Sequence, residues 1–466
     1  MGDARRESRR LFIQRSAAVV GAGLLLRGCE VPPSRRLAST GEPAAGAGAS
    51  ASSPVAAAPP KPFMPDLTPP TSEPQVRVRL ARSSAGDRGL QVASAGRGRW
   101  LRVAPVNADD TLGFERVAAS PIVATAEPGG WTVVDGQGMR LSFDGDAIDI
   151  AAAGGQPAGV SFDGTPFPGS IRLVSCSSEG AFVVDVVNGV PLEAYLPGVL
   201  ARELYAKWHP ETYAAQAVAA RSFACSEVAF WRGRRHYDVV AGQASQAYAG
   251  RTTSTVALQA VEATRGTLLL WQGKVVPAYY SSCCGGVSAS AVDAISPHPM
   301  NDIPPIQARP PRDCCASAPV WRWTSEQGDK DAANRLVAWS ASRDDVTIPR
   351  LGPVVAVETI AVATNGRPLR YRVVDDRGGT VEVAAEQLRW GLNYSAAGVT
   401  PPRQPVRSAN FSASRAPGTL RLAGRGYGHG VGLCQYGAQA SASAGVAWRT
   451  ILQGYYPGAA IDRCFA

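Results

Sequence analysis

Residues 30–75 limit the fold of this chain more than any other feature, because they contain eleven prolines among alanine, serine and glycine. A segment of this composition buries too little apolar surface to offset the entropy of ordering its backbone. Extended at about 3.1 Å per residue, it would reach roughly 140 Å. The segment is therefore expected to be a disordered tether, and the folded part is expected to begin at Val76.

The residues before the tether have the features of an export signal. The stretch "SRRLFIQ", Ser8 to Gln14, resembles the twin-arginine signature. The apolar stretch from Ala17 to Leu26 is shorter than the roughly 20 residues that span a bilayer. The following "LRGC" resembles a bacterial lipobox, which predicts a lipid on Cys29, with ordinary cleavage nearby as the alternative. Residues 1–29 are thus predicted to direct export to the periplasmic or cell-envelope side of a membrane.

The net charge of +9 does not indicate nucleic-acid binding. Residues 1–36 hold eight arginines and three acids, which leaves a net charge of only +4 on the remaining residues. No run of five or more like charges occurs anywhere in the chain. A nucleic-acid partner is therefore not expected.

Short β-branched segments, separated by glycine, aspartate and proline, recur from Val76 onward; examples are "GWTVVD", "MRLSFDG" and "AFVVDVV". They predict an α+β fold with a β-rich body and a few inserted helices. The expected divisions are a β-rich N-terminal part at 76–160 and a second domain at 161–466.

Two helical patterns interrupt the predicted strands. In the first, Pro191 to Trp208, Pro197 is expected to break the helix, because proline removes a backbone hydrogen bond. The second, Pro210 to Trp231, has proline in its first turn and an alanine run that favours helix and close packing. A last short helix is predicted within "VAWRTILQGYYPG" near the end of the chain.

A glycine-rich loop, "GRGYGHGVGLCQYGAQA", surrounds one of the four histidines of the chain. Its glycine spacing does not fit the dinucleotide fingerprint, G-x-G-x-x-G. Alternating glycines instead indicate a backbone that closely approaches another group or takes positive φ angles repeatedly. Because His429, Gln435 and Tyr436 lie close together in this segment, the loop is a candidate site.

Three long motifs resemble those of the stage II sporulation protein D / amidase enhancer (SpoIID/LytB) family. They are "VNGVPLEAYLPGVLARELYAKWHPETYAAQAVAARSFA", "YDVVAGQASQAYAG", and the glycine-rich loop with "ILQGYYPG" after it. They stand in the family's order and extend over about residues 160–466. The resemblance implies a peptidoglycan lytic transglycosylase that cuts glycan strands, or an enhancer that binds peptidoglycan and activates a separate cell-wall amidase.

The resemblance also assigns candidate residues. The catalytic glutamate of the first motif falls on Glu203, and the glycine-rich loop is expected to join the same groove, with His429, Gln435 and Tyr436 contacting or orienting the glycan. Arg221 is either a substrate contact or half of a structural ion pair. Gln246 and Tyr248 of the middle motif are weaker substrate-binding candidates, with strand capping as the alternative.

The chemistry of a lytic transglycosylase requires one essential carboxyl group, because the C6 hydroxyl of muramic acid is the nucleophile. Glu203 would protonate the leaving oxygen and then accept the hydroxyl proton, which requires a water-poor setting. Tyr205 and Trp208 are among the residues expected to supply that setting. A solvated pair with Lys207 is the ordinary alternative for a helical glutamate. The nearby acids, Glu193 and Glu211, leave a two-carboxylate hydrolase open.

Two adjacent cysteine pairs, Cys283–Cys284 and Cys314–Cys315, lie about thirty residues apart. In an exported chain they favour disulfides, and adjacent cysteines suit tetrahedral zinc poorly. Zinc binding by these cysteines is the less favoured alternative, and no other cofactor is expected. The family usually has serine where this chain has Cys434, so a Cys434–Cys464 bridge is conceivable.

Overall fold

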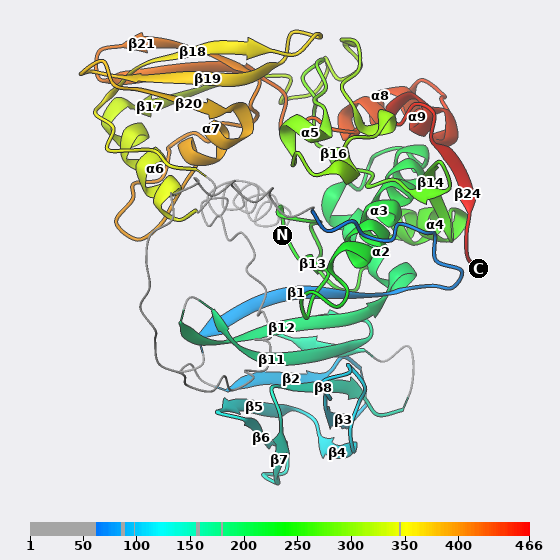
Figure 1. Cartoon of the computed structure of the whole chain (residues 1–466). Coiled ribbons are helices and arrows are strands. Elements are labelled where there is room, and N and C mark those ends of the chain that lie inside the picture. Colours follow the sequence, from blue (N-terminus) through cyan, green and yellow to red (C-terminus); the bar gives the residue numbers. More distant parts are fainter. Residues whose placement is uncertain (1–61, 85–88, 97, 155–158, 179, 344–345) are drawn as a thin grey trace, which may run out of the picture.

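The computed structural model describes residues 62–84, 89–96, 98–154, 159–178, 180–343 and 346–466. The signal-like segment, Cys29 and most of the predicted tether lie outside these residues. The described chain has three parts: a lobe of β-strands, a helical core, and an insert between residues 322 and 425 (Figure 1). The predicted α+β fold, with a β-rich body and a few helices, is confirmed.

The β lobe consists of two antiparallel sheets, apart from one short parallel strand. The first contains, in spatial order, β13 (Val239–Val240), β1 (Gln75–Ser84), β12 (Ala181–Pro191), β11 (Ser170–Ser178), β8 (Ala147–Ala152), β3 (Trp100–Pro105) and β4 (Arg116–Ala119). The second contains β10 (Thr165–Phe167), β9 (Val160–Phe162), β2 (Leu90–Ser94), β5 (Ile122–Glu127), β6 (Gly130–Val134) and β7 (Arg140–Asp144).

The strands alternate between buried and exposed residues, as half-buried strands do. In β8, for example, Ile148 and Ile150 are buried, whereas Asp149 between them is only partly covered. Strands from both sides of residue 160 contribute to each sheet, so the boundary predicted there does not separate two sheets. Residues on either side of it share one apolar core.

Two long helices follow β12 and form the centre of the helical core. The first is α2 (Leu192–Glu203), and the second is α3 (Pro210–Trp231), which has the predicted bounds. One side of α3 packs in the core of the β lobe through Tyr213 and Ala217. Its other side packs in a second core through Ala215 and Val218. Because the alanine side chains are small, this one helix packs into both cores.

The expected break at Pro197 is wrong, because α2 continues through that residue. The surrounding residues of α2 are buried, so tertiary packing compensates for the hydrogen bond that proline cannot donate. The helix also passes close to a loop at Gly198. A Cβ atom there would lie 2.2 Å from the Gly250 carbonyl oxygen, so only glycine fits.

Short elements complete the helical core. They are α4 (Thr255–Ala263), β14 (Thr267–Trp271), β15 (Lys274–Val275), β16 (Tyr280–Ser281), α5 (Ala291–Ala294), η1 (Pro299–Asn301), η2 (Pro304–Ile306), β23 (Leu433–Cys434), α8 (Gln435–Ser443), α9 (Trp448–Tyr455) and β24 (Ala460–Arg463). Helix α9 is the last helix that the sequence predicts. Strand β16 pairs in parallel with β23. This pairing places Leu433 and Cys434 of the glycine-rich loop beside Tyr280 and Ser281.

The insert forms a separate core between two three-stranded sheets and two helices. Its elements are β17 (Arg322–Gly328), α6 (Asp329–Ala341), β18 (Val354–Val362), β19 (Pro368–Asp375), β20 (Thr380–Ala384), α7 (Ala385–Leu392), β21 (Phe411–Ala416) and β22 (Thr419–Arg425). Strand β22 leads directly into the glycine-rich loop, so the insert and the helical core meet there.

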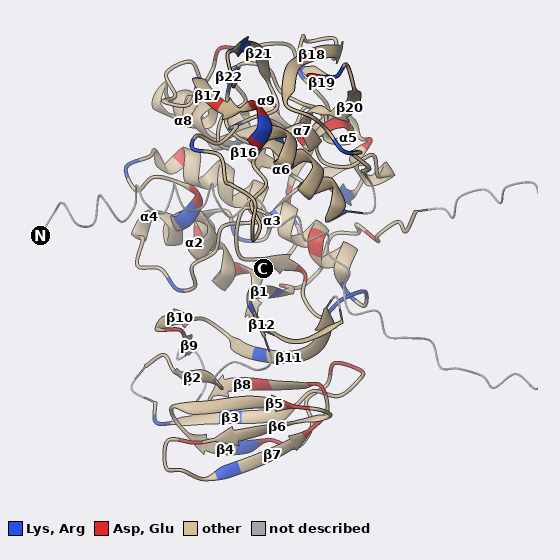
Figure 2. Cartoon of the chain, turned by 90° about the vertical axis from the view of Figure 1, so that its left-hand side faces the viewer, with Lys and Arg blue, Asp and Glu red and all other residues tan. Residues whose placement is uncertain are grey.

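The last residues assigned to the tether make contacts with the folded body. The Leu67 carbonyl accepts a hydrogen bond from the Val275 amide, and the Glu73 carboxylate accepts one from the Glu193 amide. Basic and acidic residues are interspersed over all three parts (Figure 2). None of the helices within the described ranges has the length and hydropathy needed to cross a membrane.

Candidate active site

Glu203, the last residue of α2, is the centre of the candidate site. The Ala247 amide donates a hydrogen bond of 2.9 Å to its Oε1 atom, and the Gln435 side chain donates one of 3.2 Å to Oε2. Three distant segments therefore meet at one carboxyl group. Among the described residues, Glu203 has no ion pair with Lys207, so the solvated-pair alternative is not what the structure contains.

The surroundings of Glu203 act on its acidity in two directions. Burial raises the pKa of the Glu203 carboxyl above its usual value, and the hydrogen bonds from Ala247 and Gln435 lower it. Burial is the largest of these effects, and the pKa remains raised. A carboxyl group in this balance is suited to donate a proton and later to take one back.

Gln246 links the surroundings of Glu203 by three hydrogen bonds. Its Oε1 atom accepts from the Tyr195 hydroxyl at 3.1 Å, and its Nε2 atom donates to the Ala220 carbonyl and to the Tyr280 hydroxyl. Because Gln246 is fully buried, it fixes the turn that carries the Ala247 amide rather than contacting a substrate. The sequence placed Gln246 near the site but missed this positioning role.

Tyr248 is a packing residue of the same turn. Its ring lies 4.7 Å from that of Tyr195, and its hydroxyl donates to Asn188 at 2.9 Å. The ring also fills the space beside Gly198. Tyr248 therefore helps to hold α2 against the turn that follows β13.

Arg221 forms a buried ion pair with Glu193. Two of its nitrogens lie 2.8 Å from the two carboxylate oxygens, and the arginine side chain is 0% exposed. Further bonds reach the carbonyls of Val261 and Thr267. Of the two alternatives for Arg221, the structural ion pair fits this geometry.

The other nearby acids are also engaged. Glu193 is held by Arg221 and by the Gly266 amide. The Glu211 carboxylate accepts a hydrogen bond from the Trp448 amide at the start of α9. Neither carboxylate contacts Glu203, so the site has one carboxyl group with two amide donors.

The glycine-rich loop packs against the protein's own chain. Gly426, Gly428, Gly430 and Gly432 all have φ between +68° and +94°, which only glycine adopts readily. A Cβ atom at Gly432 would lie 1.9 Å from the Tyr279 carbonyl oxygen, and one at Gly426 would lie 2.5 Å from that of Cys283. Gly426, Gly428 and Gly432 thus admit residues 279–285, and Gly430 faces the Arg367 guanidinium, so the protein's own chain accounts for the close approach.

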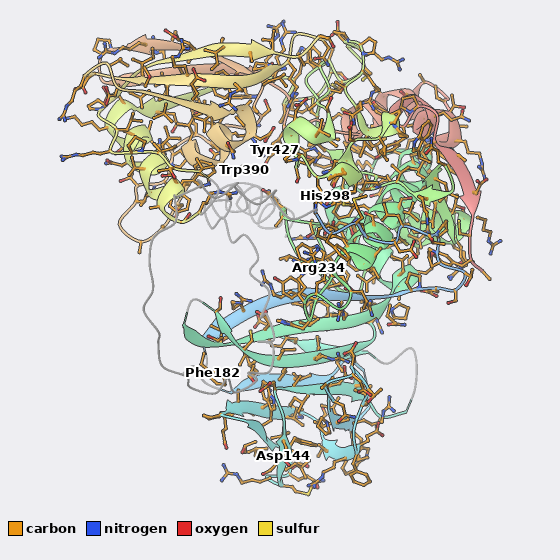
Figure 3. All side chains as sticks on the ribbon, in the orientation of Figure 1. Asp144, Phe182, Arg234, His298, Trp390 and Tyr427 are labelled. Atoms are coloured by element: carbon orange, nitrogen blue, oxygen red, sulfur yellow. The ribbon has the colours of Figure 1, made fainter. Side chains whose placement is uncertain are left out.

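Tyr427, labelled in Figure 3, shows the same close approach. Its amide and carbonyl form a pair of hydrogen bonds with Cys283, of 2.7 Å and 3.1 Å. The loop and the segment after β16 are thus hydrogen-bonded together.

His429 lies within this loop and makes no contact with Glu203. Its Nδ1 atom accepts a hydrogen bond from the Val431 amide, and Arg367 donates to its carbonyl. Burial, with smaller effects from Arg389 and Arg367, lowers the pKa of His429 to about 3. The imidazole is therefore neutral at pH 7, and its position suits holding the loop.

Gln435 and Tyr436 begin α8, where the loop ends. Gln435 is buried with its amide on Glu203. The ring of Tyr436 packs with those of Tyr205 and Trp208. Its centroid lies 5.0 Å from that of Trp208 and 6.3 Å from that of Tyr205. Tyr205 is 50% exposed, so this group presents an open aromatic surface beside α2. Sequence reasoning expected Tyr205 and Trp208 only as apolar surroundings.

The cysteine pairs meet, although Cys283, Cys284, Cys314 and Cys315 form no disulfide within the described part of the chain. The Sγ atoms of Cys284 and Cys315 are 3.6 Å apart. Cys434 joins the same cluster through Cys283 and Cys315, and therefore does not pair with Cys464.

The comparisons with known proteins agree with this architecture. The family model described as "Stage II sporulation protein", SpoIID, matches residues 182–271, which include Glu203 and Ala247. An uncharacterized protein of Brachyspira hyodysenteriae is 27% identical over 301 residues, covering 64% of this chain and 73% of that protein.

Two further relatives carry descriptive names. The "Stage II sporulation protein D" of Bacillus amyloliquefaciens is 27% identical over 293 residues, covering 59% of this chain and 75% of the relative. The "Amidase enhancer" of Bacillus subtilis is 25% identical over 291 residues, covering 56% of this chain but 39% of the relative. The segment around α2, which ends at Glu203, thus matches a recognised class of domain. The resemblance to the SpoIID/LytB family that the motifs indicate is confirmed by these matches.

Proposed function

We propose that the protein is an exported peptidoglycan lytic transglycosylase that uses Glu203 as its single acid and base. The observation that carries the proposal is the setting of the Glu203 carboxyl group, which is partly buried, has a raised pKa, and accepts hydrogen bonds from Ala247 and Gln435. Each of these features serves one step of the reaction.

In the first step, protonated Glu203 donates its proton to the glycosidic oxygen as the bond from that oxygen to C1 of muramic acid breaks. A carboxyl group with a raised pKa retains the proton that this step consumes. In the second step, the carboxylate accepts the C6 hydroxyl proton while the new bond from O6 to C1 closes the anhydro ring. The amide donors stabilise the carboxylate between the two steps.

The engagement of the other acids supports a single-carboxyl mechanism. A glycosidase that uses two carboxylates needs them at separations of about 5–9.5 Å on opposite sides of the scissile bond. Glu193 is bound in a buried ion pair, and Glu211 holds the start of α9. Both therefore have structural partners, which disfavours the two-carboxylate hydrolase.

The exposed aromatic group supports a carbohydrate substrate. Tyr205, Trp208 and Tyr436 lie next to the end of α2, and aromatic faces pack against the apolar faces of sugar rings. We assign these residues to the binding of the glycan strand. Gln435 and Gln246 position the carboxyl group and its amide donor, and His429 holds the loop.

The second candidate function is activation of a cell-wall amidase without catalysis. It is favoured by the name of one relative, "Amidase enhancer". In such a protein the same aromatic surface would bind peptidoglycan, and Glu203 would have no chemical role. The partner would then be the amidase, in addition to the glycan.

The deciding experiment compares wild type with Glu203→Gln on peptide-free glycan strands, with anhydro-ended products measured by mass spectrometry. Glutamine preserves the size of the side chain but cannot deliver a proton, so product formation should fall by about 10²–10⁴ or more. Circular dichroism and strand binding should remain unchanged. A wild type that yields no anhydro product, yet increases the activity of an added cell-wall amidase, would establish the enhancer function instead.

We further propose that the protein works on the periplasmic or cell-envelope side of the membrane, with a lipid anchor at Cys29. Support comes from the sequence of residues 1–29 alone, which lie outside the described part of the chain. A tether of this length would let the site reach glycan strands away from the bilayer.

A further inference from the structure

The hairpin that joins β18 to β19 reaches out of the insert and contacts the helical core (Figure 1). At its end the Ala363 amide donates to the Arg367 carbonyl, and the Gly366 amide donates to the Ala363 carbonyl, at 2.8 Å each. Gly366 has a φ of +85°, a conformation that favours glycine. The Arg367 amide also donates to the Asn365 side chain at 3.2 Å. We call residues 363–367 the hairpin tip, and its closed turn holds these two side chains in fixed directions.

Arg367 joins the two segments that meet at the glycine-rich loop. Its Nη1 atom donates to the Val287 carbonyl at 2.8 Å, and its Nη2 atom donates to the His429 carbonyl at 2.9 Å. A Cβ atom at Gly430 would lie 2.9 Å from Nη1, so the loop leaves space there for the guanidinium. The planar fork of arginine holds two acceptors at once. One buried side chain therefore fixes the loop relative to the segment that follows β16.

Asn365 makes a second contact with the same region. Its Nδ2 atom donates to the carbonyls of Ser288 and Arg309, at 2.9 Å and 3.0 Å. Arg309 donates in turn to the Gly432 carbonyl at 2.9 Å. The hairpin tip thus reaches the glycine-rich loop directly at His429 and indirectly through Arg309.

The contacts of Arg367 differ from those of an arginine that only stabilises the insert. Both of its hydrogen bonds lead out of the insert, whereas the Glu386 carboxylate within the insert is 3.7 Å away. Arg335 is another buried arginine of the insert, and it donates to the carbonyls of Leu392 and Thr400, which belong to the insert itself. Arg367 therefore has the position of a residue that connects the insert to the loop.

Close packing continues this connection to the candidate active site. Val431 and Leu433, which follow His429, are both 0% exposed. Packed interiors transmit a displacement rather than absorb it, so a shift of the His429 backbone would reach the end of the loop. There the Gln435 amide donates to the Glu203 carboxyl group.

We propose that Arg367, supported by Asn365, is a positioning residue for Glu203 that acts through the glycine-rich loop and Gln435. With the loop held in place, the carboxyl group keeps the donor that Gln435 supplies. This inference rests on the proposed function, because the effect on Glu203 is read from glycan cleavage. The effect on the loop itself is measured without any activity.

The first test is steady-state cleavage of peptide-free glycan by Arg367→Met, Gln435→Leu and the double variant. Arg367→Met should lower kcat by about 10–100-fold, as a misplaced group near the chemistry does. KM should change little, because Tyr205 and Trp208 belong to the connection between α2 and α3. The alkaline limb of the pH–activity profile should move to higher pH, as in Gln435→Leu, because the carboxylate loses the same donor. In the double variant the losses should not add, since both act on one hydrogen bond; additive losses or an unmoved limb would overturn the proposal.

Three further variants keep this test decisive if Arg367→Met fails to fold. Arg367→Lys keeps the charge but not the fork, so it should retain more kcat than Arg367→Met. Asn365→Ala removes the supporting contact and should give a smaller loss in the same direction. Wild-type kcat and pH profile in both of these variants would overturn the proposal. Arg372→Met is the matched control on β19, because Arg372 is 41% exposed and pairs with Glu358 and Glu382 at the surface, so its kcat should equal that of the wild type.

Hydrogen exchange followed by mass spectrometry tests the loop without activity. The amides of Gly428 and Leu433 donate to backbone carbonyls, and in Arg367→Lys the peptides that contain them should exchange about tenfold faster or more. Peptides of β19 should keep wild-type rates. Unchanged exchange in the loop would overturn the proposal, whatever the activity of the wild type. Faster exchange in the loop, with no anhydro product from the wild type, would refute the proposed function and uphold the role of Arg367 in holding the loop.

Discussion

Breaking the buried ion pair between Arg221 and Glu193 should strongly destabilise the fold. In Arg221→Met the arginine is replaced by an apolar side chain of similar length, and the Glu193 carboxylate stays buried, with the Gly266 amide still bonded to it. Both partners are at most 3% exposed, so water cannot replace the lost interactions. Removing one partner of a buried pair costs about 3–5 kcal/mol of unfolding free energy.

The assay is urea unfolding followed by far-ultraviolet circular dichroism, with wild type and variants side by side. The double variant Glu193→Leu with Arg221→Met removes both charges and should recover a large part of the loss, since an apolar pair of similar volume is often tolerated. Arg421→Met is the matched control. Its partner Glu326 and Arg421 itself are each 62% exposed, so the change should be below about 1 kcal/mol.

The alternative for Arg221 makes a different prediction. If this residue contacts the glycan, Arg221→Met should unfold at the wild-type urea concentration and lose affinity for glycan strands. That pair of results would refute the structural assignment. A loss of stability with recovery in the double variant would support it.

Three further predictions concern the carboxyl group, the loop and the anchor. Gln435→Leu removes a donor that favours the carboxylate, so the pKa of Glu203 should rise, and the alkaline limb of the pH–activity profile should move to higher pH. An unchanged limb would argue against Glu203 as the acid. Gly432→Ala should lower the free energy of unfolding in urea by more than about 3 kcal/mol, because the added Cβ atom would overlap a backbone carbonyl. The control Gly138→Ala has a similar φ and open space around it, so it should cost about 1–2 kcal/mol, and equal losses would contradict the packing argument. Cys29→Ala should release the mature protein from membranes in cell fractionation, and its retention there would exclude the lipid anchor.

The local features of the fold were predictable from the sequence. The alanine-rich helix has the predicted bounds, because proline at its first position and strong helix propensity act within the segment itself. The α+β class followed from recurring β-branched segments. The break expected at Pro197 does not occur, because the local penalty of proline is outweighed by burial of the residues around it.

The features that depend on distant contacts were not predictable. The alternating glycines are needed because a segment about 150 residues earlier in the chain packs closely against them, and no local sequence pattern reveals that contact. The donor from Ala247 is a backbone amide, and any residue type except proline would supply it. The motifs placed Glu203 and Gln435 near one site, but their direct hydrogen bond required the folded chain.

That hydrogen bond joins residues 232 positions apart, and this separation determines when the site can exist. Synthesis proceeds at about 5–20 residues per second, so Gln435 emerges roughly 10–50 seconds after Glu203. During that interval α2 can form, but its terminal carboxyl group has only part of its surroundings. A nascent or C-terminally clipped chain therefore lacks the completed site. Glu203 has its full set of hydrogen-bond donors only in chains that are completely synthesised and folded.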